Sequence, residues 1–122
     1  MIEHLPFLLG KLLFGGFFVF FGLQHFLKLQ AMSSYAKSKG IPQPKTSTIL
    51  SGLLIIAGGL GVMFEYHMSV SLIFIVLFLI PTSILMHNFW TCTTPEDRQT
   101  EFTQFMKNIA LAGGALMLYS LI

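Results

Sequence analysis

The residues of this sequence with the clearest chemical potential lie at the ends of long apolar stretches. His87 and Asn88 end one apolar run, His25 lies near the end of an earlier run, and Asn108 lies near the start of a later run. Imidazole and amide groups can donate and accept hydrogen bonds, so together they could bind a small polar head group such as a carbonyl. The spacing predicts that His25, His87 and Asn108 converge in one polar pocket. Asn88 and the aromatic Trp90 flank His87 and are expected to belong to the same site.

Each histidine also has an ordinary structural explanation. A histidine at a helix end can simply bond a neighbouring carbonyl, and Trp90 is of the type that anchors a helix at the membrane interface. His25 and His87 could also ligate a b-type haem from two different helices, but no other haem pattern accompanies them, so haem is not favoured. The sequence contains no phosphate-binding, dinucleotide-binding or metal-binding motif and no Ser-His-Asp grouping. Neither a metal site nor a self-contained enzyme is predicted.

The composition indicates an integral membrane protein of one domain, residues 1–122. Of its 122 residues, 54% are hydrophobic and only 10% are charged, compared with about 25% charged residues in soluble domains. A lipid bilayer is therefore the expected partner. The net charge of +2 is too small to predict nucleic-acid binding. The single cysteine, Cys92, excludes an intramolecular disulfide and predicts a free thiol.

Four apolar runs are long enough to cross a bilayer, which requires about 20 residues. The predicted helices cover about 5–29, 46–64, 68–90 and 105–122. The resulting fold class is all-α, with four transmembrane helices in an up-down bundle. Between the first two helices, the segment after Lys28 is amphipathic and ends at Gly40, so we expect a short helix lying along the membrane interface.

One intramembrane charge pair is expected at the opposite end of the bundle. Lys11 shares a helical stripe with Gly15, Gly22 and His25, and this stripe should face the bundle because an ionisable residue is costly against lipid. Glu65 lies in the short turn between the second and third helices, near the same membrane face. The sequence therefore predicts that Lys11 pairs with Glu65.

The distribution of basic residues predicts the orientation in the membrane. Six of them belong to the two loops at one end of the helices: Lys28, Lys37, Lys39, Lys45, Arg98 and Lys107. Basic residues concentrate on the cytoplasmic side of membrane proteins. The loops between helices one and two and between helices three and four are therefore expected in the cytoplasm, with both termini outside.

Several short motifs, in their order and spacing along nearly the whole chain, resemble the DoxX family of small four-helix membrane proteins. The motifs are Lys11, Gly22-Leu23-Gln24-His25, Gly40-Ile41-Pro42, Ser51-Gly52 with Gly58-Gly59, and His87 through Lys107-Asn108 into Ala112-Gly113-Gly114. The family often has arginine in place of Lys11 and lysine in place of His25. A glutamate of its second helix corresponds here to Ile55.

The resemblance implies a membrane subunit associated with quinone-linked oxidoreductases, in the cytoplasmic (inner) membrane of a bacterium. Other membrane or redox subunits would then be partners, and a quinone is the cofactor that the pocket of His25, His87 and Asn108 would bind. A non-catalytic scaffold or assembly partner is the alternative, because the glycine-rich helix faces are already explained by helix packing. A homo-oligomer is compatible with both interpretations.

Overall fold

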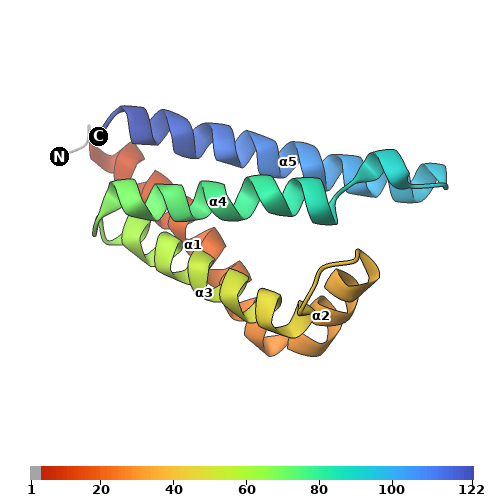
Figure 1. Cartoon of the computed structure of the whole chain (residues 1–122). Coiled ribbons are helices and arrows are strands. Elements are labelled where there is room, and N and C mark those ends of the chain that lie inside the picture. The colour runs from red at the N-terminus through yellow and green to blue at the C-terminus, as the bar shows by residue number, and fades with distance from the viewer. Residues whose placement is uncertain (1–3) are drawn as a thin grey trace.

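The computed structural model of the chain describes residues 4–122, and the regular structure in this range is entirely helical. The long helices are α1 (Leu5–Leu27), α3 (Pro44–Met63), α4 (Met68–Met86) and α5 (Pro95–Ser120). The short elements are α2 (Leu29–Ser38) and the 3-10 turn η2 (Phe89–Thr91). Successive long helices run in opposite directions, and the C-terminus lies at the end opposite α2 (Figure 1). The prediction of an all-α protein is confirmed.

Three helical segments of the described chain are long and apolar enough to cross a membrane: Leu5–Leu27, Pro44–Met63 and Met68–Thr91. The fourth predicted span, 105–122, corresponds mostly to the second half of α5. The sequence Thr94-Pro95-Glu96-Asp97 predicts a helix start ahead of this span, with Thr94 as N-cap, and α5 does begin at Pro95: the Thr94 side-chain oxygen accepts a hydrogen bond from the Asp97 amide at 3.2 Å. The charged first half of α5 explains why the whole helix is not among the three spans. A fourth span stays a prediction.

The end of α4 differs from the sequence prediction. The helix was expected to continue to residue 90, but it ends at Met86, and His87 is its C-cap residue with φ −114° and ψ 45°. Asn88 also lies outside the helical region, and η2 then redirects the chain towards α5. Because they lie at this break, the side chains of His87 and Asn88 can reach neighbouring elements.

The predicted short helix between α1 and α3 is confirmed as α2. It ends in a Schellman motif, in which Gly40 adopts a left-handed φ of 79° and the Ile41 amide donates to the Ala36 carbonyl at 3.1 Å. A residue with a Cβ atom would be strained at Gly40. The motif turns the chain back towards α3, so that α2 packs on α3.

The long helices pack as two pairs. α1 packs on α3 and α4 packs on α5, with α3 and α4 joined by a tight hairpin. The two pairs separate towards the end that holds α2 (Figure 1). The buried apolar core lies between the pairs: Phe18, Ile55, Val62, Leu72, Ile75, Leu79, Ala112 and Ala115. The pairs are therefore closely packed where the core lies, and the helices diverge towards the α2 end (Figure 1).

Glycines allow α1 and α3 to approach each other closely. A Cβ atom built on Gly59 would lie 2.6 Å from the Gly15 carbonyl oxygen, and one on Gly22 would lie 2.9 Å from the Gly52 carbonyl oxygen. These are contacts with backbone, which a side-chain rotation cannot relieve. By contrast, a Cβ atom on Gly114 of α5 would meet nothing within 4 Å.

This difference predicts opposite effects for two otherwise equal substitutions. Gly59→Ala should separate α1 from α3 and reduce the free energy of unfolding by about 1–3 kcal/mol, as overpacking does in other cores. Gly114→Ala should be neutral or stabilising by up to about 1 kcal/mol, because alanine has the higher helix propensity. Thermal unfolding of both variants in the same detergent measures this. Equal melting temperatures for the two variants would contradict the packing described.

Candidate functional site

A cavity of about 550 Å³ lies between the two helix pairs at the α2 end. All five α-helices contribute to its wall, which is mainly apolar and includes Phe17, Phe18 and Phe78. The polar residues on the wall are His25, Tyr35, Ser47, Thr48, Ser51, Thr82, His87, Gln104, Lys107 and Asn108. Small-molecule sites in proteins have this volume and this combination of apolar walls with a few polar groups. We call this cavity the central pocket.

The structure brings three of the five residues singled out from the sequence into the central pocket. His25, His87 and Asn108 all line it. Asn88 does not, and its side-chain oxygen instead accepts a hydrogen bond from Lys39 at 2.9 Å. Trp90 does not line the pocket either. Its side chain is 48% exposed and packs edge-on against aromatic neighbours on η2 and α5, which suits an interfacial anchor.

His25 is buried in the pocket wall with one ring nitrogen unpartnered. Its Nδ1 lies 2.7 Å from the carbonyl oxygen of Phe21, one turn earlier in α1. Because a carbonyl can only accept, Nδ1 carries the proton in this bond. No described residue bonds to the other nitrogen, Nε2, although His25 is only 6% exposed. Nε2 is therefore available to a molecule in the pocket.

Asn108 is also buried without a hydrogen-bond partner. It is 6% exposed, and its side-chain amide makes no hydrogen bond within residues 4–122. Thr48, another polar residue on the wall, differs because its hydroxyl donates to the Pro44 carbonyl at 2.8 Å. Within residues 4–122, the side-chain polar atom that is fully enclosed by protein and has no partner is Gln24 Oε1, so the amide of Asn108 and Nε2 of His25 are not sealed in protein. They are two unsatisfied groups that face one cavity.

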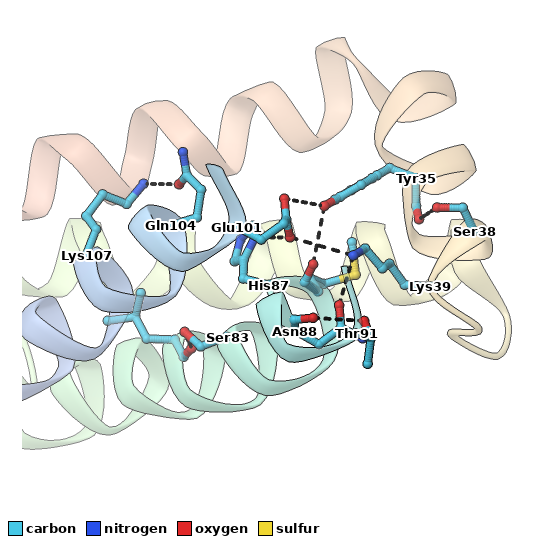
Figure 2. Close-up of polar contacts among 12 residues, drawn as sticks. Tyr35, Ser38, Lys39, Ser83, His87, Asn88, Thr91, Glu101, Gln104 and Lys107 are labelled. Carbon is cyan, nitrogen blue, oxygen red and sulfur yellow. Dashed lines mark hydrogen bonds and ion pairs between the residues drawn. The ribbon is translucent and has the colours of Figure 1, made fainter. Parts of the chain in front are cut away.

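At the α2 end of the pocket, five residues form a polar network around one carboxylate. They come from α2 and the residue after it, from the two residues that follow α4, and from α5. We call this network the Glu101 cluster, and its members are Tyr35, Lys39, His87, Asn88 and Glu101 (Figure 2). The Glu101 carboxylate accepts from the Tyr35 hydroxyl at 2.9 Å and lies 3.2 Å from Nδ1 of His87 and 3.6 Å from Nζ of Lys39. The Tyr35 hydroxyl also contacts the Met86 carbonyl at 3.3 Å. The cluster therefore ties α2 to both α4 and α5.

The Glu101 cluster is largely shielded from solvent. The side chains of Glu101, Lys39 and His87 are 14%, 17% and 17% exposed. Burial raises the pKa of the Tyr35 phenol, and its hydrogen bond to Glu101 raises the pKa further. Tyr35 therefore stays a hydrogen-bond donor at neutral pH.

The sequence had given no reason to select Glu101. Lys39 entered the sequence analysis only as a basic loop residue, and Tyr35 lies in the amphipathic segment between the first two long helices. One signal was available: Glu101 precedes Asn108 by seven residues, which places both on the same face of one helix. A carboxylate on the face that carries a pocket residue requires a partner, and α2 supplies it.

The structure also brings Lys11 and Glu65 together, at the end of the molecule far from the pocket. Lys11 Nζ lies 2.5 Å from a Glu65 carboxylate oxygen. The Lys11 side chain is 14% exposed, whereas the Glu65 side chain is 50% exposed. The two partners therefore differ in how well water can replace the contact.

This asymmetry predicts that Lys11→Leu is tolerated better than Glu65→Leu. Removing the lysine leaves a glutamate that water can hydrate, but removing the glutamate leaves a shielded ammonium without its partner. Melting temperatures in detergent and yields in membranes measure the difference. A Glu65→Leu protein as stable as the Lys11→Leu protein would show that the ion pair does not compensate Lys11.

No group of three or more His, Cys, Asp or Glu side chains in residues 4–122 is arranged to hold a metal ion. Cys92, close to the Glu101 cluster in the chain, is a half-buried free thiol.

Comparison with known families gives one match: the family model described as DoxX matches residues 7–88. No curated protein and no solved structure matches the chain. The matched part extends from α1 to Asn88 and includes His25, Tyr35 and His87, whereas α5 with Glu101 and Asn108 lies beyond it. Since the match covers most of the chain, the protein belongs to the DoxX family.

Proposed function

We propose that this DoxX family protein binds the head of a quinone in the central pocket and is an accessory subunit of a quinone-linked membrane oxidoreductase. One observation supports this most strongly. The buried amide of Asn108 and Nε2 of His25 have no protein partner, and both belong to the wall of a cavity of about 550 Å³. Such groups indicate a ligand with polar atoms on an otherwise apolar body.

The two unsatisfied groups suit both redox forms of a quinone. The NH₂ of Asn108 can donate to a quinone carbonyl, and Nε2 of His25, unprotonated while Nδ1 donates to Phe21, can accept from a quinol hydroxyl. Phe17, Phe18 and Phe78 supply apolar and aromatic surface for the ring. The chain itself offers no electron donor by its sequence, so a partner subunit would supply the electrons.

The proposed setting is a four-span, up-down bundle in a bacterial cytoplasmic membrane. α1, α3 and the segment Met68–Thr91 provide three spans, and the apolar half of α5 would provide the fourth. The basic residues at this end support a cytoplasmic position for the α2 end: Lys28, Lys37 and Lys39 in or next to α2, Lys45 at the start of α3 and Arg98 at the start of α5. The central pocket would then open near the cytoplasmic surface.

A scaffold or assembly partner without a ligand is the second candidate. The glycines of α3 do not support it specifically, because other parts of the same chain already occupy their faces: α1 packs against Gly52 and Gly59, and α4 packs against Gly58 and Gly61. Gly113 and Gly114 of α5 do favour it, since nothing in the described chain lies within 4 Å of where their side chains would be. A helix of a partner or of a second copy could pack there.

Purification in a mild detergent, followed by solvent extraction and mass spectrometry, tests the proposal. A quinone retained in near-stoichiometric amount supports the quinone function. A Soret band in the absorption spectrum would instead indicate haem between His25 and His87. A subunit that co-purifies with a chain free of quinone and haem would favour the scaffold.

A further inference from the structure

Lys107 places an ammonium group between the two helix pairs. It belongs to α5 and lines the central pocket, and its Nζ lies 5.8 and 5.7 Å from the ring centroids of Phe17 and Phe21 on α1. Its hydrogen bond goes to the Gln104 side-chain oxygen at 2.8 Å (Figure 2). Lys107 as a residue is exposed, and within the described chain its ammonium contacts aromatic faces and one neutral amide.

Within residues 4–122, no carboxylate forms an ion pair with Lys107. The chain does pair two of its other lysines, Lys11 with Glu65 and Lys39 with Glu101. Glu101 is the acid nearest to Lys107 on the same helix, but its oxygens already contact Tyr35, Lys39 and His87. No acid of the pocket wall is therefore left to neutralise Lys107.

The position of Lys107 along α5 makes this lack of a partner significant. Lys107 lies about 9 Å further along the helix axis than Glu101, at the start of the apolar half of α5. An ammonium at membrane depth is costly unless an anion or a polar cavity compensates it. The next residue is Asn108, so the cation and the unsatisfied amide are adjacent in the pocket wall.

We infer that the central pocket selects quinones whose head carries a negative charge on oxygen, such as an ionised hydroxyquinone or an anionic reduced form, and that Lys107 is the residue that binds this oxygen. The inference rests on the proposed function, because it specifies the head group of the ligand. The Lys107 ammonium would donate to the charged oxygen while Asn108 bonds a neighbouring carbonyl. A neutral quinone would bind in the same place without the charge-assisted hydrogen bond.

Two probes with the same ring and alkyl chain show whether the pocket prefers an anionic head group over a neutral one. One is a neutral 2-alkyl-1,4-naphthoquinone, and the other is the 2-hydroxy-3-alkyl-1,4-naphthoquinone, which is ionised at neutral pH. Both are titrated into the full chain in one detergent, and binding is followed by quenching of Trp90 fluorescence and by calorimetry. We expect the hydroxyquinone to bind about tenfold more tightly, since a hydrogen bond between charged groups exceeds a neutral one by about that factor.

Variants of Lys107 test whether this residue causes the tighter binding of the hydroxyquinone. Lys107→Gln should remove the difference between the two probes, and Lys107→Arg should keep it. Lys28→Gln, an exposed lysine at the same end but outside the pocket wall, should leave it unchanged. Melting temperatures confirm that each variant is folded.

Two results would overturn the inference while leaving quinone binding in place: equal affinity of the native protein for both probes, or a Lys107→Gln protein that weakens both probes equally. If neither probe binds to the native protein, the proposed function fails together with the inference.

Discussion

Replacing Glu101 by leucine should detach α2 from α4 and α5 and lower the free energy of unfolding by about 3 kcal/mol. The expectation follows from the three groups that contact this carboxylate, namely the Tyr35 hydroxyl, Lys39 and His87. The side chains of Lys39 and His87 are only 17% exposed, so water cannot fully replace the lost partner. Removing one partner of a shielded charge network typically costs about 3–5 kcal/mol, and the remaining bond of Lys39 to Asn88 should moderate this.

Hydrogen exchange of the α2 amides, together with thermal unfolding in detergent, measures the effect. Exchange should accelerate in α2 of the Glu101→Leu protein while α1 and α3 remain protected. Glu101→Gln should give an intermediate effect, because a neutral amide oxygen can still accept from Tyr35. Glu96→Gln is the matched control, since Glu96 lies exposed on the first turn of the same helix. Unchanged exchange in α2 of Glu101→Leu would show that α2 is secured by α3 alone.

Replacing Asn108 by leucine should lower quinone affinity by about tenfold without unfolding the protein. Leucine has the same branched side-chain shape as asparagine but is larger, and its extra volume can extend into the pocket that Asn108 lines, so the packing of α5 against α4 should survive. The amide has no bond to the protein that could be lost, because none exists within residues 4–122. The effect should therefore fall on the ligand, at about 1–1.5 kcal/mol for one hydrogen bond in a dry pocket.

Titration with the neutral alkyl naphthoquinone gives the affinities, and circular dichroism checks the fold. Gln99→Leu makes the same kind of change on an exposed position of α5 and should bind the quinone as the native protein does. If the Asn108→Leu protein binds the quinone with native affinity, Asn108 does not contribute to quinone binding. An Asn108→Leu protein that is much less stable than Gln99→Leu would indicate that Asn108 has a structural role.

The sequence predicted the helical fold well because long apolar runs have few alternatives. Residues 5–27, 44–63 and 68–86 form helices close to the expected positions, and the cap at Thr94 fixes the start of α5. The end of α4 was misjudged by a few residues. A run of apolar residues through Trp90 does not show where the backbone leaves the helix, since Phe89 and Trp90 can anchor a turn at the interface as readily as a helix.

The site was predictable only in part. His25 and Asn108 reach the pocket because each lies on a helix face that points between the pairs, whereas His87 reaches it from the break that follows α4. The Glu101 cluster depends instead on the turn at Gly40, which returns the chain so that Tyr35 and Lys39 face α5. Such contacts link residues more than sixty positions apart through side chains, and no periodicity within one helix encodes them. The lack of an acid beside Lys107 is likewise not visible in the sequence, because it depends on Glu101 contacting Tyr35, Lys39 and His87 instead.

Photoaffinity labelling with an azido-quinone tests the central claim most directly, because it reports where a quinone binds on the whole protein in its membrane. The label is activated in membranes containing the protein, and the modified peptides are mapped by mass spectrometry. We expect adducts on the pocket wall, at Met32, Phe78 or Leu79, and a strong reduction of these adducts by excess unlabelled quinone and by Asn108→Leu. Adducts confined to outward-facing residues such as Leu13 and Met117, unaffected by competitor, would contradict the account, because they would show a quinone that meets this protein only as a component of the surrounding lipid.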